Sequence, residues 1–164
     1  TVIDILFWGE TMIPSLTDAG HLPAGIHDCT LEEIGRRFGK ATETRRRLMK
    51  GLDALVKRAR QAGAKHFYVD GSFVTQKSEP GDWDGVLVMP VGWNAAGRWA
   101  AFFTDRERIK KEFGGDLFTV MEDDADILDH YVQHVFATDR EGRKKGLLRI
   151  RLKGEEKDDG PDQE

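Results

Sequence analysis

The sequence is poor in cysteine and contains no long hydrophobic run, and each shortage excludes a class of protein. Cys29 is the single cysteine among 164 residues, so an internal disulfide is excluded and a reducing compartment is expected. No apolar run approaches the roughly 20 residues that a membrane-spanning helix needs. The apolar run at residues 2–8 is too short, and too closely flanked by acids, for a secretory signal. We therefore expect a cytoplasmic protein without a membrane partner.

The chain also lacks a broad excess of negative charge, although its net charge is −4. Residues 153–164 hold two lysines and six acids, which alone account for that value, and the rest of the chain carries 23 basic and 23 acidic side chains. We expect this acidic tail to be disordered and residues 1–152 to form a single domain. Residues 30–65 hold eleven basic and four acidic side chains. Such a stretch can meet phosphates, but it more often forms a solvated helix face.

Apolar residues at helical spacing predict two helices in the first half of the chain. Thr30 and Glu33 form a capping-box pattern. A short helix should therefore begin at Leu31 and end near Gly39. A longer helix is predicted over residues 44–61. Its apolar stripe consists of Leu48, Leu52, Leu55, Val56 and Ala59.

Four short β-rich runs alternate with further helical segments. The predicted strands cover residues 65–70, 83–89, 116–121 and 146–152, and further helices cover residues 102–113 and 125–136. The apolar side of the last helix is expected to contain Ile127, Leu128, Tyr131 and Val135. Residues 1–29, with a strand-like run at residues 2–8, should wrap over the domain surface. The alternation predicts an α/β (α+β) domain, a small mixed β-sheet flanked by helices.

Two aspartates at the start of the second strand form the first candidate site. Asp82 and Asp84 are separated by one residue, and residues i and i+2 of a strand point to the same face. Their carboxylates can therefore converge, while Trp83 points to the opposite side, into the core. Asp116, at the start of the third strand, would add another carboxylate. Such an oxygen-rich set suits Mg²⁺ or Mn²⁺, with phosphates and waters completing the coordination.

A Gly-Ser pair after the first strand is the matching candidate for phosphate binding. Gly71 permits close approach of backbone N–H groups, and Ser72 adds a hydroxyl donor. Lys77, in the following loop, could neutralise a triphosphate, although a solvent-facing loop lysine is the more common case. The acids also have plainer explanations: Pro80-Gly81-Asp82 is good turn chemistry, and an aspartate after Gly-Gly often ends a turn. Asp70 is better explained as a cap of the Gly-Ser turn than as part of the site.

The order of these features resembles a known signature. An apolar strand, a Gly-Ser pair, a loop and Asp-x-Asp on a strand occur in the sequence VDGSFVTQKSEPGDWDGVLV. The pattern is similar to that of the DNA polymerase β-like nucleotidyltransferase superfamily, and GGDLFTV resembles the third-acid segment of its minimal bacterial and archaeal members. A closer likeness to an uncharacterised bacterial family of this kind covers roughly residues 12–152. It includes LPAGIHDCTLEEIGRRFG, FGGDLF and DREGRKKGLLRI.

The resemblance implies a nucleotidyltransferase fold and transfer of a nucleoside monophosphate from an NTP to a hydroxyl of RNA or of a partner protein. The residues that would bind the nucleotide are Gly71, Ser72 and Lys77. The residues that would bind Mg²⁺ or Mn²⁺ and take part in catalysis are Asp82, Asp84 and Asp116. Many minimal members of the superfamily work within toxin–antitoxin pairs, and the resemblance implies that setting here.

Two features depart from the superfamily pattern. Gly85 follows the second acid, where an apolar strand residue is usual, which puts the local strand geometry in doubt. No second helical domain follows to hold an acceptor. These departures leave an alternative open, a catalytically inactive module of the same fold that binds a partner protein.

Three other groups of residues have plainer explanations. The basic residues Arg45, Arg46, Arg47 and Lys50 could receive a nucleotide tail or RNA, but a solvated helix face is favoured. His130 and His134 stand at i and i+4, yet no third ligand for zinc is evident, so two exposed polar residues are expected. Cys29 has no basic or helix-N-terminal setting that would make it a nucleophile.

Overall fold

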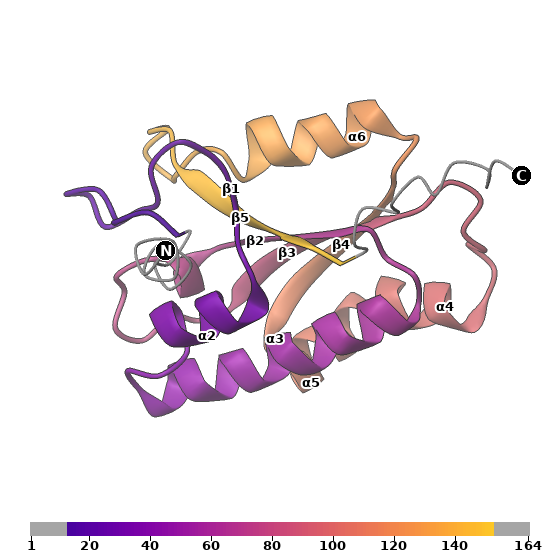
Figure 1. The fold of residues 1–164 in the computed structure, drawn as a ribbon, viewed down its shortest axis with the longest axis horizontal. Helices are drawn as coiled ribbons and strands as arrows, with labels where there is room; N and C mark the ends of the chain where they lie inside the picture. Colours follow the sequence, from indigo (N-terminus) through magenta and orange to yellow (C-terminus); the bar gives the residue numbers. More distant parts are fainter. Residues whose placement is uncertain (1–12, 153–164) are drawn as a thin grey trace, which may run out of the picture.

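Five strands form one mixed β-sheet in the order β1-β5-β2-β3-β4 in the computed structural model, which describes residues 13–152. The strands are β1 (Gly25–Asp28), β2 (His66–Asp70), β3 (Trp83–Met89), β4 (Gly115–Met121) and β5 (Gly146–Arg151). β1 runs parallel to β5 and β4 parallel to β3, whereas β2 is antiparallel to both of its neighbours. Helices cover both faces (Figure 1), so the predicted mixed sheet flanked by helices is confirmed.

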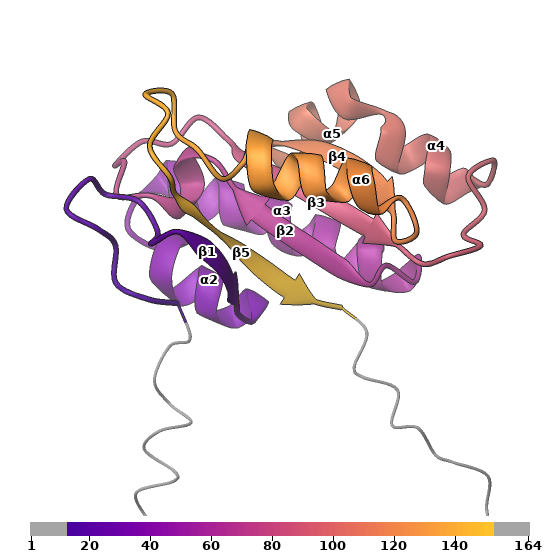
Figure 2. The same ribbon diagram turned by 90° about the horizontal axis from the view of Figure 1, so that it is seen from above.

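The helices are divided unequally between the two faces of the sheet. One face carries α2 (Leu31–Phe38), α3 (Glu43–Gln61), α4 (Arg98–Thr104) and α5 (Arg106–Phe113). The other carries α6 (Ala125–Asp129), which continues into the π-type segment η2 (His130–Val135) and overlies β3 and β4 in Figure 2. A single 3₁₀ turn, η1 (Ser72–Val74), follows β2. None of the helices within residues 13–152 is long and apolar enough to cross a membrane.

The caps of α2 and α3 follow the sequence closely. The Thr30 hydroxyl accepts the Glu33 N–H at 3.2 Å, and the Glu33 carboxylate accepts the Thr30 N–H at 3.3 Å, which completes the predicted capping box. At the start of α3 the Thr42 hydroxyl accepts the Arg45 N–H at 3.1 Å. Each such cap contributes about 1 kcal/mol to helix stability. All five residues of the predicted α3 stripe are buried.

The core under β3 explains the glycine that departs from the superfamily pattern. Trp83 is fully buried, and its indole N–H donates to the Phe113 carbonyl at 3.0 Å. The Phe67 ring meets it edge-on, with 5.9 Å between ring centroids. A Cβ on Gly85 would lie 2.9 Å from the Phe67 ring, and one on Gly115 would overlap the Trp83 ring. Since β3 runs unbroken through Gly85, the doubt about its geometry is removed.

The opposite face of the sheet packs against η2, and here the predicted apolar side needs correction. Leu128 and Tyr131 pack against the buried Val132 and Phe136, as predicted, whereas Ile127 and Val135 are 45% and 43% exposed. The helical segment predicted over residues 125–136 exists, but its second half has π-type winding. The wider turns of η2 shift which of its side chains face the sheet, so a 3.6-residue period places Val135 there instead of Phe136.

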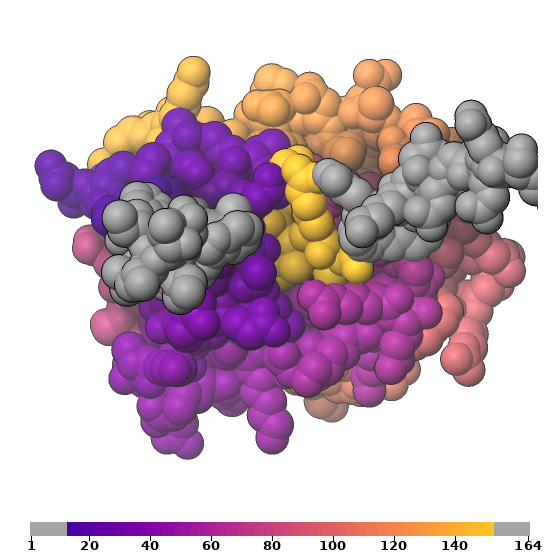
Figure 3. Space-filling model, viewed as in Figure 1, coloured from indigo at the N-terminus to yellow at the C-terminus, as the bar shows by residue number. Residues whose placement is uncertain are grey.

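Two other expectations from the sequence were wrong. The helix predicted over residues 102–113 is two helices, because Asp105 interrupts it and caps α5 through the Arg108 N–H at 3.2 Å. Residues 1–29 do more than wrap over the surface, since β1 joins the sheet beside β5. Figure 3 shows the indigo N-terminal part next to the yellow residues of β5. The strand-like run at residues 2–8 and the acidic tail lie outside the described residues.

Candidate active site

Three aspartates form a row across three adjacent strands. Asp70 on β2 is the register partner of Asp84 on β3, and Asp84 is the register partner of Asp116 on β4. Neighbouring strands lie roughly 4.8 Å apart, and residues in register point to the same face of the sheet. That face is the one covered by η2, because Val86 and Val88 on β3 share the alternation of Asp84. The sequence predicted two members of this row, Asp84 and Asp116.

Burial and neighbouring negative charges disfavour the ionised form of Asp84, at the centre of the row. Its pKa is raised from 3.8 to about 6, first by burial and then by the negative charges of Asp82, Asp70 and Asp116. Lys145 opposes the shift. The carboxylate of Asp84 therefore interacts with three other carboxylates. Such crowding of negative charge is typical of sites that bind cations or perform acid–base chemistry.

Gly71 is required where the Gly-Ser turn meets the acids. Its φ and ψ of 89° and −176° belong to a backbone region that is essentially restricted to glycine. A Cβ there would lie 2.8 Å from Asp84 Oδ2 and 3.0 Å from the Asp84 nitrogen. The Ser72 hydroxyl connects the turn to the loop before β3, since it accepts the Gly81 N–H at 3.3 Å and lies 3.4 Å from the Asp82 carbonyl. The turn and the acid pair thus form one structural unit.

Arg45 holds the loop that follows the turn, which corrects its assignment to a solvated helix face. The side chain is only 5% exposed. Its guanidinium donates to the carbonyls of Phe38, Phe73 and Thr75 at 3.1, 2.7 and 2.8 Å, and also to that of Lys77. The sequence could not separate Arg45 from its neighbours, because only packing shows which arginine of the run turns inward.

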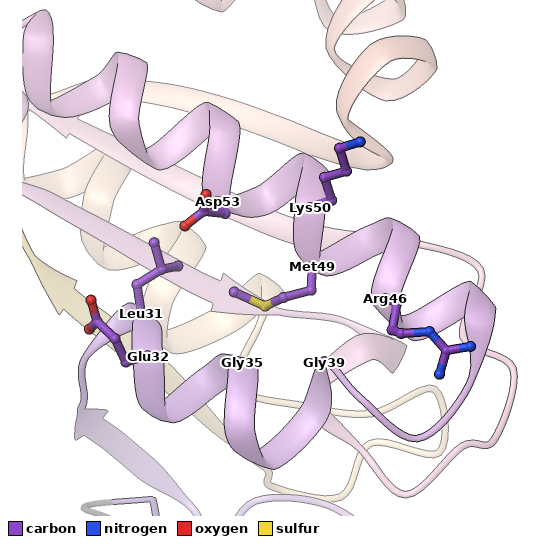
Figure 4. Close-up of a pocket in the computed structure, with 8 residues that line it drawn as sticks. All are labelled: Leu31, Glu32, Gly35, Gly39, Arg46, Met49, Lys50 and Asp53. Carbon is purple, nitrogen blue, oxygen red and sulfur yellow. The ribbon is translucent and has the colours of Figure 1, made fainter.

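Arg46, Arg47 and Lys50, the other basic residues of that run, are exposed, as expected. Arg46 and Lys50 line a hollow of about 410 Å³ between α2 and α3. In Figure 4, Met49 lies across this hollow toward Gly35 and Gly39. A Cβ on Gly39 would lie 2.7 Å from Met49 Cγ. The hollow therefore lies over a close contact between α2 and α3, and none of the predicted site residues lines it.

A pocket of about 600 Å³ lies beside the acid pair. One wall consists of the Gly-Ser turn and the loop up to β3, including Gly71, Ser72, Lys77, Asp82 and Asp84. The other wall includes Asp139, Arg140 and Lys145, from the loop before β5. Five of the six predicted site residues therefore gather around one pocket. Asp116 does not line it and lies on the opposite side of Asp84 from β2.

The pair Asp70–Lys145 was missed by the sequence analysis. Asp70 is 3% exposed, and its carboxylate oxygens accept hydrogen bonds from Lys145 Nζ at 2.8 and 3.0 Å. Burial raises the pKa of Asp70, while the Lys145 charge and the Gly71 N–H act against that rise. Asp70 thus does contact the Gly-Ser turn, as predicted, and in addition holds a lysine at the pocket. No signal connects two residues 75 positions apart in one sequence.

Two carboxylates of the candidate metal site are paired with basic residues of α5. Arg106 binds Asp116 with both carboxylate oxygens at 2.8 Å, and Lys110 lies 3.2 Å from Asp82. Within residues 13–152 no three Asp, Glu, His or Cys side chains are grouped so that they could hold a metal ion directly. Arg106 and Lys110 are 52% and 62% exposed, and exposed pairs contribute at most about 1 kcal/mol. Both pairs would have to open before Asp82 and Asp116 could contact a cation.

The remaining candidates behave as the plainer explanations predicted. Cys29 is buried, and burial raises the pKa of its thiol to about 12, so it is not a nucleophile. His130 and His134 are both exposed, with ring centroids 6.0 Å apart.

The fold and this site define a small α+β domain with a carboxylate row beside a Gly-Ser turn. Residues 14–151 match the Family of unknown function (DUF6932), and the chain belongs to that family. Searches of curated proteins and of solved structures found no match.

Proposed function

We propose that the protein is a metal-dependent nucleotidyltransferase that transfers a nucleoside monophosphate from an NTP to a hydroxyl of RNA or of a protein. The observation that carries the proposal is the position of Asp84. It lies between Asp70 and Asp116 in register, against the Gly71 backbone, and its pKa is raised to about 6 by burial and three neighbouring carboxylates. The resemblance to the nucleotidyltransferase signature supports the same interpretation.

Each group has a distinct role in the proposed reaction. The Gly71 backbone and the Ser72 hydroxyl would contact the phosphates, and Lys77 would add positive charge at the pocket rim. Asp82, Asp84 and Asp116 would hold Mg²⁺ or Mn²⁺. When bound, such ions neutralise charge on the attacking and leaving oxygens. The acids must be ionised for this role, and a pKa of about 6 leaves most of Asp84 ionised at neutral pH.

The acceptor would approach from the Asp116 side, because the pocket fills the other side of Asp84. The acceptor oxygen forms a bond to the α-phosphorus, and the bond from that phosphorus to the α–β bridging oxygen breaks. Pyrophosphate leaves, and the hydroxyl proton passes to Asp116. Asp116 is free for this role only after Arg106 releases it, so Arg106 becomes available to the incoming acceptor or phosphate.

One observation favours a second candidate, a catalytically inactive partner-binding module. Arg106 satisfies both oxygens of Asp116, and its guanidinium also lies 4.3 Å from the centroid of the Phe118 ring. A carboxylate held by a bidentate arginine is well compensated without a metal. In this case the Asp116–Arg106 pair belongs to the surface that binds the partner, and no turnover occurs.

A transfer assay distinguishes the two candidates. The protein, Mg²⁺ and each NTP, labelled at the α-phosphate or the γ-phosphate, are incubated with total RNA and cell-lysate proteins. We expect α-label, but no γ-label, in one acceptor class. Asp84→Asn should reduce the rate several hundredfold or more, because the phosphoryl charge is no longer clamped.

The matched control is Asp53→Asn, which removes an acid of α3 that pairs with Lys57 at 2.8 Å on the surface. It should transfer label at the wild-type rate. If the wild-type protein labels no acceptor, or if Asp84→Asn labels as fast as wild type, the transferase proposal is refuted. The partner-binding module then becomes the better description.

A further inference from the structure

The second wall of the pocket is a short, internally bonded loop. Its ends are joined by the Asp139 N–H bond to the Arg143 carbonyl at 2.9 Å and by the Lys145 N–H bond to the Ala137 carbonyl at 2.8 Å. Asp139 is occupied within this loop, because it accepts the N–H groups of Glu141 and Arg143 at 3.0 and 2.8 Å and the Arg143 side chain at 2.7 Å. The charged groups that this wall can offer to a ligand are therefore cationic.

Lys145 is more buried than Arg140, the other cation of this wall. Its side chain is 15% exposed and lines the pocket, and its ammonium group is held by hydrogen bonds to the Asp70 carboxylate. An ammonium group has three N–H donors, and two hydrogen bonds to Asp70 leave one for a ligand. Lys145 therefore pays little conformational entropy when it binds an anion, because its position is set before the ligand arrives.

Charges on both walls match a chain of phosphates. Lys145 and Arg140 lie on one wall, and Lys77 lies on the other, beside the Gly71 backbone and the Ser72 hydroxyl. Asp82 and Asp84, which also line the pocket, would repel a bare anion, so binding requires a divalent cation beside them. The pocket thus combines two acids that need a cation with basic side chains that can contact phosphate oxygens.

We infer that Lys145, positioned by Asp70, and Arg140 bind the β- and γ-phosphates of a magnesium-bound nucleoside triphosphate. The inference rests on the proposed function and names the groups that hold the leaving pyrophosphate portion. Asp70 is then a positioning residue and not a metal ligand. This role explains why a fourth carboxylate is buried next to the three candidate metal ligands.

The test is calorimetric titration with Mg²⁺–tripolyphosphate and with Mg²⁺–ATP. The main variant carries Asp70→Asn and Lys145→Gln together, so no unpaired charge is buried and a neutral hydrogen-bonded pair can replace the ion pair. We expect binding of both ligands to weaken about tenfold to a hundredfold, the range for loss of a charge-assisted hydrogen bond. Lys144→Gln, at an exposed neighbouring lysine that does not line the pocket, should bind like wild type.

Two further variants keep the test decisive if the double variant fails to fold. Lys145→Arg retains the charge and should bind within about threefold of wild type, and Arg140→Gln, at an exposed side chain, should weaken binding by about threefold to tenfold. Wild-type affinity in the double variant overturns the inference, and if that variant does not fold, wild-type affinity in Arg140→Gln does so. A wild-type protein that binds neither ligand also overturns it. These binding measurements do not depend on the label-transfer assay that tests the proposed function. If Asp82→Asn with Asp84→Asn abolishes binding while the double variant at Asp70 and Lys145, or Arg140→Gln in its place, leaves it intact, the proposed function stands and only this inference fails.

Discussion

Replacing Asp84 by asparagine should stabilise the metal-free protein, although it removes a central residue of the candidate site. In the folded chain the ionised Asp84 is partly buried and repelled by Asp82, Asp70 and Asp116. Asparagine has nearly the same shape and no charge, so the repulsion disappears while the packing is retained. If Asp84 served only to stabilise the fold, its replacement by asparagine would lower the free energy of unfolding instead.

The size of the effect follows from the shift in the pKa of Asp84. One pKa unit corresponds to about 1.36 kcal/mol, so a rise from 3.8 to about 6 gives an upper bound of about 3 kcal/mol. Because part of the side chain reaches solvent, where charges are screened, we expect about 1–2 kcal/mol. For a domain of this size, 1 kcal/mol corresponds to roughly 2–4 °C in melting temperature.

The pH dependence has a definite sign. The folded protein binds the Asp84 proton more tightly than the unfolded chain does, so wild-type stability falls as the pH rises from about 4 to about 6. Above pH 6 the penalty is fully present. The variant lacks this titration, so the difference in unfolding free energy between the two proteins should be near zero at pH 4 and complete at pH 8.

Urea denaturation in the presence of a chelator, at pH 4, 6 and 8, measures this difference. Asp53→Asn serves as the control, since its carboxylate lies at the surface of α3 and pairs with Lys57. The reasoning is refuted if Asp84→Asn is less stable than wild type at pH 8, or if its advantage is the same at pH 4 and pH 8.

Three further predictions test the supports of the site. Gly71→Ala should lower the unfolding free energy by about 1–3 kcal/mol, because its backbone region excludes side chains and a Cβ would meet Asp84 Oδ2 at 2.8 Å. Gly92→Ala, at a positive φ of 79° with open space around the Cβ position, should cost less in the same urea titration; an equal cost would contradict the crowding argument. Arg45→Met should lower the unfolding free energy by about 3 kcal/mol or more, since four backbone carbonyls lose a buried donor, whereas Arg46→Met should change it by no more than about 0.5 kcal/mol. Cys29, with its pKa raised to about 12, should react with a thiol reagent at pH 8 only when the protein unfolds, and rapid labelling of the native protein would contradict its burial.

The parts of the fold that sequence predicts well are those with strong local signals. The capping box at Thr30, the stripe of α3 and the strand from Trp83 to Met89 depend on neighbouring residues and are present almost as predicted. The break at Asp105 is also a local feature, yet the apolar residues on both sides of it concealed a capping aspartate. The short strand β1 could not be found, because four residues gain strand structure only from pairing with β5.

The same contrast between local signals and long-range contacts applies to the residues of the candidate site. Gly71, Ser72, Asp82 and Asp84 lie within one local motif, and all four line one pocket. The roles of Arg45 and Lys145 depend on contacts with distant segments, so the sequence gives no sign that one is buried and the other held by Asp70. The pairing of Arg106 with Asp116 is equally a product of packing, since a residue of α5 reaches the neighbouring strand.

The most direct test of the proposed metal–nucleotide site is a crystal structure with Mg²⁺ and a non-hydrolysable NTP. We expect a cation at roughly 2.0–2.1 Å from carboxylate oxygens of Asp82 and Asp84, with the phosphates against Gly71 and Ser72. Lys110 should have left Asp82 to make room for it. A nucleotide bound elsewhere, or Asp82 and Asp84 without a cation at saturating Mg²⁺, would contradict the proposed site.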